Sequence, residues 1–477
     1  MPEFFVENFG CRATQADGAA LERQFEERGL SRASSVKQAS VVVLNTCTVT
    51  NGADQDARAA IRRVRRQNPE ARIIVTGCYA QRAPEEIASL PGVDLVVGNS
   101  HKHQLADIAL NEPKAASPVQ SFVPIDALET TRQRRTTDDE RQLFVSDIFA
   151  HTELLAAPVF DAANERTRPN LKVQDGCDNR CSFCVIPFVR GQSRSLEAGR
   201  IISEVNTLVN AGYREVVISG INLGRWGRDL EATSSRVGTA AFSCPGEQRS
   251  PATLAILIRA ILTQTSLEKL RISSVEPMDW SDELIELVAT SRRIAKHAHV
   301  PMQSGNDDVL RRMRRKYRPW HYREKIEKIR AAMPTAAIGA DVMVGFPGET
   351  DAEFEATRKM IEDLPFTYLH VFTYSARPGT PAAAMKNKVP VHIARERNRI
   401  LRELASEKKL SFMRSFIGKL VEAITLNVTG SNSDGEFTEA LTDNYLKLRL
   451  CGTHEPNRWH TASVRKVVSG SLAGPLV

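Results

Sequence analysis

The 477-residue sequence lacks both a membrane-spanning segment and a disulfide framework. No stretch approaches the roughly 18 to 20 consecutive apolar residues that a bilayer span requires. Residues 1–7 also lack the basic and apolar segments of a secretory signal. We therefore expect a cytoplasmic protein with no membrane partner. Its eight cysteines are too few for a disulfide-stabilised fold of this length, and clustered cysteines in a reducing compartment indicate metal or redox chemistry instead.

The composition is that of an ordinary globular protein, with 42% hydrophobic and 25% charged residues. A chain of this length predicts roughly two to four domains. The net charge of +7 and the pI of about 9.0 suit a polyanionic partner. Basic side chains crowd two short helical stretches: Arg58, Arg62, Arg63, Arg65 and Arg66, and then Arg311, Arg312, Arg314, Arg315, Lys316 and Arg318. Either run alone is most simply a solvated helix face, but two runs in a basic chain favour RNA or DNA.

The first block, residues 1–110, alternates short apolar runs with helical segments, which predicts a doubly wound parallel sheet. Expected strands cover residues 4–6, 40–44, 72–75 and 93–97. Cys11, Cys47 and Cys78 follow the first three of these strands. The carboxyl ends of parallel strands share one edge of a sheet, so we expect the three thiols to converge there. One buried cysteine is commonplace, but three at equivalent places predict a three-thiolate metal site.

Two irregular stretches separate or interrupt the predicted domains. Residues 111–168 contain scattered prolines and Thr and Asp runs, so we expect a linker or loosely ordered arm there. Residues 231–250 are rich in Ser, Gly, Thr and Ala and carry Cys244. We expect this second stretch to be a surface loop with an incidental cysteine.

The central block, residues 169–410, is a longer strand–helix alternation. Its expected strands are residues 171–175, 216–220, 271–275, 298–302, 337–345 and 368–374. Six such units predict an incomplete (β/α)6 barrel with its active site at the carboxyl ends of the strands.

The last block, residues 411–477, changes to β character. Its expected strands are residues 420–428, 436–441, 445–450 and 461–468. This pattern predicts a small β-barrel, an architecture often used to hold nucleic acid. A stability or oligomerisation cap fits the pattern nearly as well.

Cys177, Cys181 and Cys184 form a C-x3-C-x2-C motif directly after the first barrel strand. Three thiolates this close together are how cysteine-ligated iron–sulfur centres are held. Zinc is the natural competitor, but a closed structural zinc site needs four ligands, and no fourth Cys or His follows nearby. An open coordination position is typical of a catalytic metal.

The motif in this architecture, with Phe183 before its last cysteine, resembles the radical S-adenosylmethionine (SAM) superfamily. The resemblance implies that Cys177, Cys181 and Cys184 bind a [4Fe–4S] cluster. The fourth iron of that cluster would chelate SAM, whose reductive cleavage gives a 5′-deoxyadenosyl radical.

With its N-terminal three-cysteine domain and its C-terminal barrel, which looks like a TRAM domain, nearly the whole chain is similar to the methylthiotransferases. This similarity implies a second [4Fe–4S] cluster on Cys11, Cys47 and Cys78, whose open iron carries the transferred sulfur. It also implies that one SAM donates the methyl group and a second supplies the radical. The implied partners are a tRNA anticodon stem-loop and a low-potential electron donor of the flavodoxin or ferredoxin type.

Within the methylthiotransferases, several stretches are similar to the branch acting on N6-threonylcarbamoyladenosine at tRNA position 37. These stretches are residues 176–181 with 190–195, 219–224, 301–305 with 311–315, and 441–445. Ile221 stands where the isopentenyladenosine branch usually has Gln. The alternatives are an enzyme acting on isopentenyladenosine in tRNA or on a ribosomal-protein aspartate, and a zinc- and RNA-binding protein without activity. The positive charge favours RNA over a protein substrate.

SAM contacts are expected at the ends of the barrel strands, because polar side chains there can bind a ligand and glycines allow the backbone to approach it. The candidates are Gly220, Asn222, Ser274, Glu276, Gln303, Ser304, Gly305, Asp341 and Gly345. For each glycine, a plain turn explains the residue equally well. No catalytic residue is predicted beyond the cluster ligands.

Overall fold

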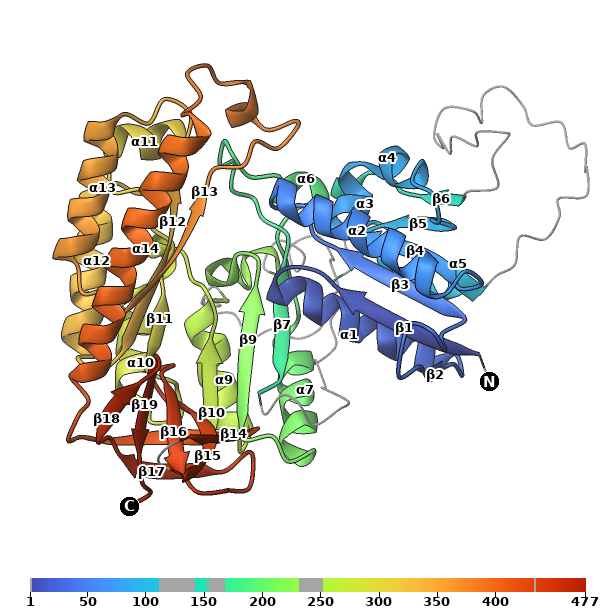
Figure 1. Cartoon of the computed structure of the whole chain (residues 1–477). Helices are drawn as coiled ribbons and strands as arrows, with labels where there is room; N and C mark the ends of the chain where they lie inside the picture. The colour runs from blue at the N-terminus through green and yellow to red at the C-terminus, as the bar shows by residue number, and fades with distance from the viewer. Residues whose placement is uncertain (1, 111–141, 152–153, 155–167, 231–251, 433–434) are drawn as a thin grey trace, which may run out of the picture.

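The computed structural model describes residues 2–110, 142–151, 154, 168–230, 252–432 and 435–477. The predicted loop at 231–250 with Cys244, and most of the predicted arm at 111–168, lie outside the described residues. Figure 1 shows an N-terminal sheet beside the central barrel and a C-terminal sheet below it. No helix in the described ranges is long and apolar enough to cross a bilayer.

The N-terminal sheet has six parallel strands in the order β2-β1-β3-β4-β5-β6. The strands are β1 (Glu3–Asn8), β2 (Ser31–Arg32), β3 (Val41–Thr46), β4 (Arg72–Gly77), β5 (Leu95–Gly98) and β6 (Gln142–Phe144). Helices α1 (Arg12–Glu27) and α5 (Leu105–Leu110) share a core with one face, and α2 (Asn51–Gln67), α3 (Cys78–Arg82) and α4 (Pro84–Ala88) with the other. β3 is buried on both faces, as its continuous apolar run predicts. The doubly wound prediction is confirmed.

One element of this sheet was predicted wrongly. β6 falls within the stretch that we expected to be a linker, and it pairs in parallel with β5. The short β2 was also not predicted. Both strands lie at sheet edges, where only one neighbour pairs, and two or three residues carry no periodicity to recognise.

The central region is an open barrel of six parallel strands, with one short antiparallel strand, β8 (Arg194–Ser195), beside the first. The six strands are β7 (Asn170–Asp175), β9 (Glu215–Gly220), β10 (Lys269–Ile272), β11 (His297–His299), β12 (Ala337–Val344) and β13 (Tyr368–Thr373). Isolated bridges from Leu270 to Ile294 and from Ser274 to His299 join β10 to β11. Among the described residues β7 and β13 do not pair, so the barrel is incomplete as predicted.

The barrel strands alternate between a helix-covered face and a polar inner face. Ala298, Ile338 and Ala340 belong to one large apolar core shared with the surrounding helices. Their neighbours His297, His299 and Asp341 therefore point to the opposite, inner face. The covering helices are α7 (Ala198–Asn210), α9 (Leu254–Gln264), α10 (Asp282–Thr290), α11 (Asp307–Arg312), α12 (Pro319–Ala332), α13 (Asp351–Asp363) and α14 (Val391–Arg414).

The C-terminal sheet has the order β17-β14-β15-β16-β19-β18 and is antiparallel except between β16 and β19. Its strands are β14 (Leu420–Asn432), β15 (Gly435–Thr442), β16 (Lys447–Cys451), β17 (Trp459–Ser463), β18 (Lys466–Val468) and β19 (Ser471–Gly474). A bridge between Ala462 and Leu476 closes the sheet into the predicted small barrel. The single strand expected at 461–468 is two strands, β17 and β18.

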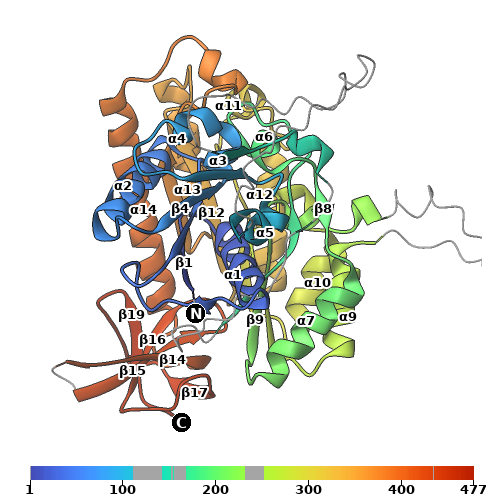
Figure 2. The same ribbon diagram turned by 90° about the vertical axis from the view of Figure 1, so that its right-hand side faces the viewer.

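Polar contacts join the three parts. Arg377, after β13, donates to Thr48 at 2.9 Å and pairs with Asp54 on α2. Below the central barrel, Lys296 N donates to Asp443 Oδ1 at 2.6 Å, and Asn444 Nδ2 donates to the Thr335 carbonyl at 2.8 Å. Lys296 and Thr335 precede β11 and β12. The C-terminal barrel therefore lies at the amino ends of the barrel strands, opposite the Cys177 loop (Figures 1 and 2).

Candidate functional site

The loop with Cys177, Cys181 and Cys184 follows β7 and is fixed by backbone contacts. Gly176 has φ +71°, and a Cβ there would lie 1.9 Å from the Gln192 carbonyl oxygen, so only glycine fits this turn. Cys177 N donates to Gly191 O at 3.1 Å. Ser182 donates through its N and Oγ to the carbonyls of Met313 and Arg312, at 3.0 and 2.7 Å. These contacts hold the loop between α6 (Ile186–Arg190) and the segment after α11.

Two side chains donate hydrogen bonds to sulfur atoms of this loop. Arg315 Nη1 lies 3.2 Å from Cys181 Sγ, and Asn222 Nδ2 lies 3.6 Å from Cys177 Sγ. Burial raises the pKa of the Cys177 thiol and raises that of Cys184 to about 12. Donors aimed at sulfur oppose this effect, since they favour the thiolate that a metal requires.

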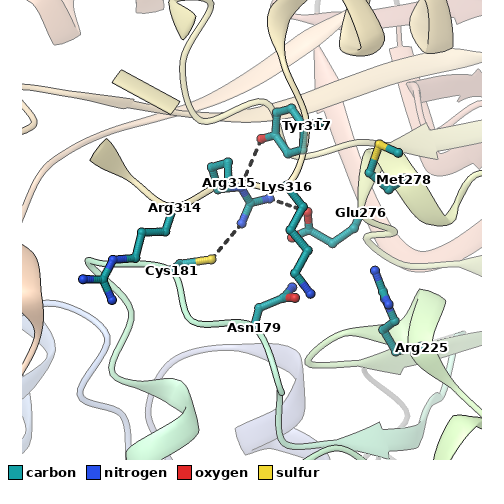
Figure 3. A pocket seen from close by; sticks show the side chains of 9 residues that line it. All are labelled: Asn179, Cys181, Arg225, Glu276, Met278, Arg314, Arg315, Lys316 and Tyr317. Carbon is teal, nitrogen blue, oxygen red and sulfur yellow. Dashed lines mark hydrogen bonds and ion pairs between the residues drawn. The ribbon is translucent and has the colours of Figure 1, made fainter. Parts of the chain in front are cut away.

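Arg315 connects the loop to a predicted SAM contact. Its Nη2 pairs with Glu276, and its Nε donates to Tyr317 Oη at 3.3 Å. Figure 3 shows these contacts in a pocket that also exposes Arg314, Lys316 and Arg225. The sequence assigned Arg315 to a basic run with a solvated or nucleic-acid-binding face. That assignment is wrong for Arg315, which is only 8% exposed. No periodicity distinguished it from its exposed neighbours.

The structure divides the predicted SAM contacts into two groups. Asn222 contacts Cys177, and Glu276 contacts Arg315 beside Cys181. Gln303 lies at the same end of the barrel, where it bridges to Val342. Gly305 and Gly345 instead pack against helices: a Cβ on Gly305 would lie 2.8 Å from Thr357 Cα, and one on Gly345 would lie 2.6 Å from Ala394 Cβ.

The other predicted contacts have partners within the fold. Ser304 Oγ bonds Thr357 Oγ1 at 3.1 Å. Asp341 Oδ2 lies 3.2 Å from His299 Nε2, on the inner face. Ser274 bridges to His299 in parallel, and Gly220 ends β9 beside Gln174.

Unsatisfied polar atoms at the end of the barrel fit a bound polar ligand. Ser219 Oγ, Asn222 Oδ1 and Gln303 Oε1 are buried without a hydrogen-bond partner among the described residues. Gln303 also has φ +63°, a strained conformation for a residue with a side chain. Buried polar groups in native proteins are almost always satisfied. The ribose hydroxyls and amino-acid group of SAM would supply the missing partners.

The N-terminal cysteines lie at the carboxyl edge of their sheet. Cys11 precedes α1 and is exposed, Cys47 follows β3 and is buried, and Cys78 begins α3 and is buried. A Cβ on Gly10 would lie 2.9 Å from Cys47 Sγ, which places Cys11 beside Cys47. Burial, with the neighbouring Cys78, raises the pKa of Cys47 to about 12.

The two cysteine groups meet at α6. Cys78 packs against Val185 and Val189, and Val185 directly follows Cys184. No three His, Cys, Asp or Glu side chains in the described ranges are placed to hold a single metal ion. A [4Fe–4S] cluster makes a different demand, because each cysteine binds its own iron at a different corner.

A buried ionic network that the sequence analysis did not predict lies beside this meeting point. Asp17 on α1 pairs with Lys172 on β7, with Lys102 at 3.2 Å and with Arg190 on α6 at 2.8 Å. Asp175 pairs with Lys172 at 2.8 Å and with Arg190 at 3.0 Å. Burial alone would raise the pKa of Asp17, but the three cations hold it well below its usual value. The network therefore binds the N-terminal sheet to the barrel.

Family and structural similarities agree with this fold. Residues 171–361 match the Radical SAM superfamily, and residues 3–98 match uncharacterized protein family UPF0004. The radical S-adenosylmethionine methyltransferase TsrM from Kitasatospora setae, solved with cobalamin and a [4Fe-4S] cluster, has a related fold. Its TM-score is 0.50 at 15% identity, covering 80% of this chain and 77% of that chain. Fold and cysteine loop thus define a radical SAM enzyme, a class that uses SAM and an iron–sulfur cluster.

The family of the chain follows from relatives that align with it over most of their length. The chain is 34% identical to "Threonylcarbamoyladenosine tRNA methylthiotransferase MtaB" of Bacillus subtilis (strain 168), over 94% of this chain and 90% of the relative. The protein of the same name in Aquifex aeolicus (strain VF5) is 35% identical, over 94% and 97%. The chain belongs to the MtaB-type radical SAM methylthiotransferases. A "tRNA-2-methylthio-N(6)-dimethylallyladenosine synthase" of Novosphingobium aromaticivorans is 33% identical, over 88% and 86%.

Proposed function

We propose that the chain transfers a methylthio group to C2 of N6-threonylcarbamoyladenosine at tRNA position 37, as a sulfur-group transferase. The observation that carries this proposal is the meeting of two cysteine groups at α6 in a chain of the MtaB type. Relatives whose names state the threonylcarbamoyladenosine activity are 34% and 35% identical, against 33% for the dimethylallyladenosine relative.

Each cysteine group would hold one [4Fe–4S] cluster with an open iron: Cys177, Cys181 and Cys184 beside SAM, and Cys11, Cys47 and Cys78 beside the transferred sulfur. When bound, these groups would supply reductive SAM cleavage and the sulfur atom, with the methyl group coming from a second SAM. The chain contributes donors that favour thiolate at Cys177 and Cys181. Asn222, Glu276 and Gln303 would orient SAM at the end of the barrel.

A low-potential electron donor of the flavodoxin or ferredoxin type would dock beside Cys181. Arg180, Arg314 and Lys316 are exposed there, and none forms an ion pair within the described part of the chain. An acidic protein would find complementary charge at this surface, close to a cysteine ligand. In the first basic run, by contrast, Arg58, Arg63 and Arg65 already pair with Glu86, Glu7 and Asp94.

The RNA partner would be the anticodon stem-loop of tRNA, with the C-terminal barrel as a second point of attachment. The net charge of +7 supports a polyanionic substrate. A cytoplasmic location agrees with these partners.

The test combines metal analysis with nucleoside mass spectrometry. Anaerobically reconstituted protein is expected to hold about eight irons, two clusters of four. With SAM and a reductant it should add one methylthio group to threonylcarbamoyladenosine in tRNA. Modification of isopentenyladenosine instead would move the chain to the other tRNA branch. About eight irons with unmodified tRNA would keep the two-cluster enzyme and move the substrate to another base or to a protein. Zinc without iron would leave only a binding protein.

A further inference from the structure

A group of histidine and tyrosine side chains lies on the inner face of the central barrel. The Tyr368 hydroxyl lies 2.7 Å from His297 Nε2 and 2.9 Å from His299 Nδ1. His370 lies beside His299, with the rings tilted and their centroids 5.4 Å apart. Tyr445, from the C-terminal barrel, lies against His297 with centroids 5.0 Å apart. We call these five residues the inner-face cluster.

Three guanidinium groups surround Tyr445. Arg12 Nη2 donates to Tyr445 Oη at 3.2 Å, while Arg168 and Arg271 lie over its ring at 5.9 and 5.2 Å from the centroid. Arg271 pairs with Glu215 at 2.6 Å. Neither Arg12 nor Arg168 forms an ion pair with any carboxylate in the described ranges. The three guanidinium groups outnumber the one carboxylate, Glu215, that acts on both Arg168 and Arg271. Burial lowers the pKa of Arg168, and Glu215 opposes this effect. A partly buried group of cations that exceeds its carboxylates is less unfavourable when a ligand supplies a further anion.

Two of the histidines, His297 and His370, do not contribute to this charge near neutral pH. Burial, aided by Arg271, lowers the pKa of His297 well below its usual value. Burial and His299 also lower the pKa of His370. Asp341 opposes this shift, and Arg12 acts in its direction. A neutral imidazole serves as a hydrogen-bonding group, so the arginines are the main source of positive charge here.

Part of the cluster is accessible from the open side of the barrel, while His297 and His299 are buried. His370 and Arg12 are exposed, and Tyr368 and Tyr445 are half-buried. His370 lies on β13, which does not pair with β7 in the described part of the chain. Helix α1 lies beside β7 on this open side (Figure 1). Arg12 directly follows Cys11, a proposed ligand of the sulfur-carrying cluster, so a base reacting there would pass close to Arg12.

We propose that Arg12 and Arg168, with the inner-face cluster, bind the carboxylate of the threonylcarbamoyl group and so select this base. The inference rests on the proposed function and deepens it. Threonylcarbamoyladenosine carries a carboxylate and a hydroxyl on its N6 substituent, whereas isopentenyladenosine carries only hydrocarbon there. An apolar substituent would supply the two arginines with no further anion, and incompletely paired polar groups in a site discriminate between substrates. An RNA phosphate offers related anionic chemistry, and the experiment distinguishes it.

The test measures the Kd of reconstituted holoenzyme for three fluorescent anticodon stem-loops. The RNAs share one sequence and carry threonylcarbamoyladenosine, isopentenyladenosine or unmodified adenosine at position 37. Arg12→Met should weaken binding of the first RNA by about 10- to 100-fold, the range of a charge-assisted hydrogen bond. Binding of the other two should not change. Arg168→Met should act in the same way, and Arg12→Lys should retain part of the preference.

Arg395→Met is the matched control, because Arg395 is exposed on α14 and has no ion pair within the described residues. Tyr445→Phe removes the hydroxyl that positions Arg12 and should reduce the preference less than Arg12→Met does. Iron content of each variant verifies that the site at Cys11 is intact.

Two results would overturn the proposal. An equal loss of affinity for all three RNAs would assign Arg12 to a phosphate, and an unchanged preference for threonylcarbamoyladenosine in both arginine variants would exclude the subsite. Failure of the proposed function is separate, since it would appear as wild-type enzyme that methylthiolates a different base.

Discussion

The two cysteine groups are assembled in different ways. Cys177, Cys181 and Cys184 lie in one loop, whereas Cys11, Cys47 and Cys78 follow three strands of a sheet. The loop is held by hydrogen bonds that it donates to the backbone carbonyls of Gly191, Met313 and Arg312. The dispersed group depends on the strand order of a complete domain. A local motif can therefore be recognised from spacing, but a dispersed one can be recognised only after the sheet has been predicted.

The donors to sulfur also differ. Cys181 receives a hydrogen bond from the Arg315 guanidinium at 3.2 Å. In the dispersed group the sulfur contacts are neutral: Asn99 Nδ2 lies 3.6 Å from Cys78 Sγ, and Thr14 Oγ1 lies 3.5 Å from Cys11 Sγ. Hydrogen bonds and charge near the sulfurs tune the potential of an iron–sulfur cluster. The Cys177, Cys181 and Cys184 group, whose proposed cluster receives the electron for SAM cleavage, is the one in which a cation donates a hydrogen bond to sulfur.

Cysteine substitutions should have the largest effects, and the two cysteine groups should differ in which reaction is lost. Cys181→Ala is expected to abolish SAM cleavage, because it removes a ligand of the proposed SAM-binding cluster. Cys47→Ala should spare SAM cleavage and prevent methylthio transfer. Chromatographic measurement of 5′-deoxyadenosine, together with nucleoside mass spectrometry, separates the two. Normal 5′-deoxyadenosine release from Cys181→Ala would exclude the radical SAM assignment of this loop.

The junction between the two groups should be the next most sensitive position. Asp17→Asn leaves Lys102, Lys172 and Arg190 buried with one fewer carboxylate, which should cost about 3 kcal/mol of unfolding free energy. Because its pKa is lowered in the folded state, Asp17 stabilises the protein above its unfolded pKa of about 3.9 and loses this effect as pH falls through the folded value. Denaturant unfolding should thus show wild type and variant converging in acid. A pH-independent difference would contradict this assignment.

The contacts at this junction could not be predicted from the sequence, whereas the main elements of the fold could. The parallel sheet, the open barrel and the small C-terminal barrel follow from apolar runs and their spacing. The pairing of Asp17 with Lys172 does not, because the partners are separated by 155 residues and neither has a local pattern. Arg315 was likewise indistinguishable from exposed neighbours until the fold brought it to Glu276 and Cys181. Buried polar contacts between distant segments depend on tertiary packing and leave no periodic signal.

Charge reversal beside the local group should produce a moderate effect that depends on the reductant. Arg314→Glu with Lys316→Glu is expected to lower the rate of SAM cleavage about ten-fold with a flavodoxin, because complementary charge accelerates association. The rate with dithionite should not change, since a small reductant needs no docking surface. Parallel assays with both reductants provide the measurement. An equal loss with both would mean that the two residues act on the cluster or on SAM, and a loss of tRNA affinity would assign them to RNA.

The smallest effect is expected outside both groups. Cys451 is exposed at the end of β16 in the C-terminal barrel, on a different part of the fold from either cysteine group. Cys451→Ser should leave the iron content at about eight per chain, because no other cysteine of the described residues lies in that barrel. Iron and acid-labile sulfide are measured in the reconstituted variant and compared with the wild-type protein. A loss of about four irons would show that one of the two groups recruits this thiol, and the separation into a local and a dispersed group would then need revision.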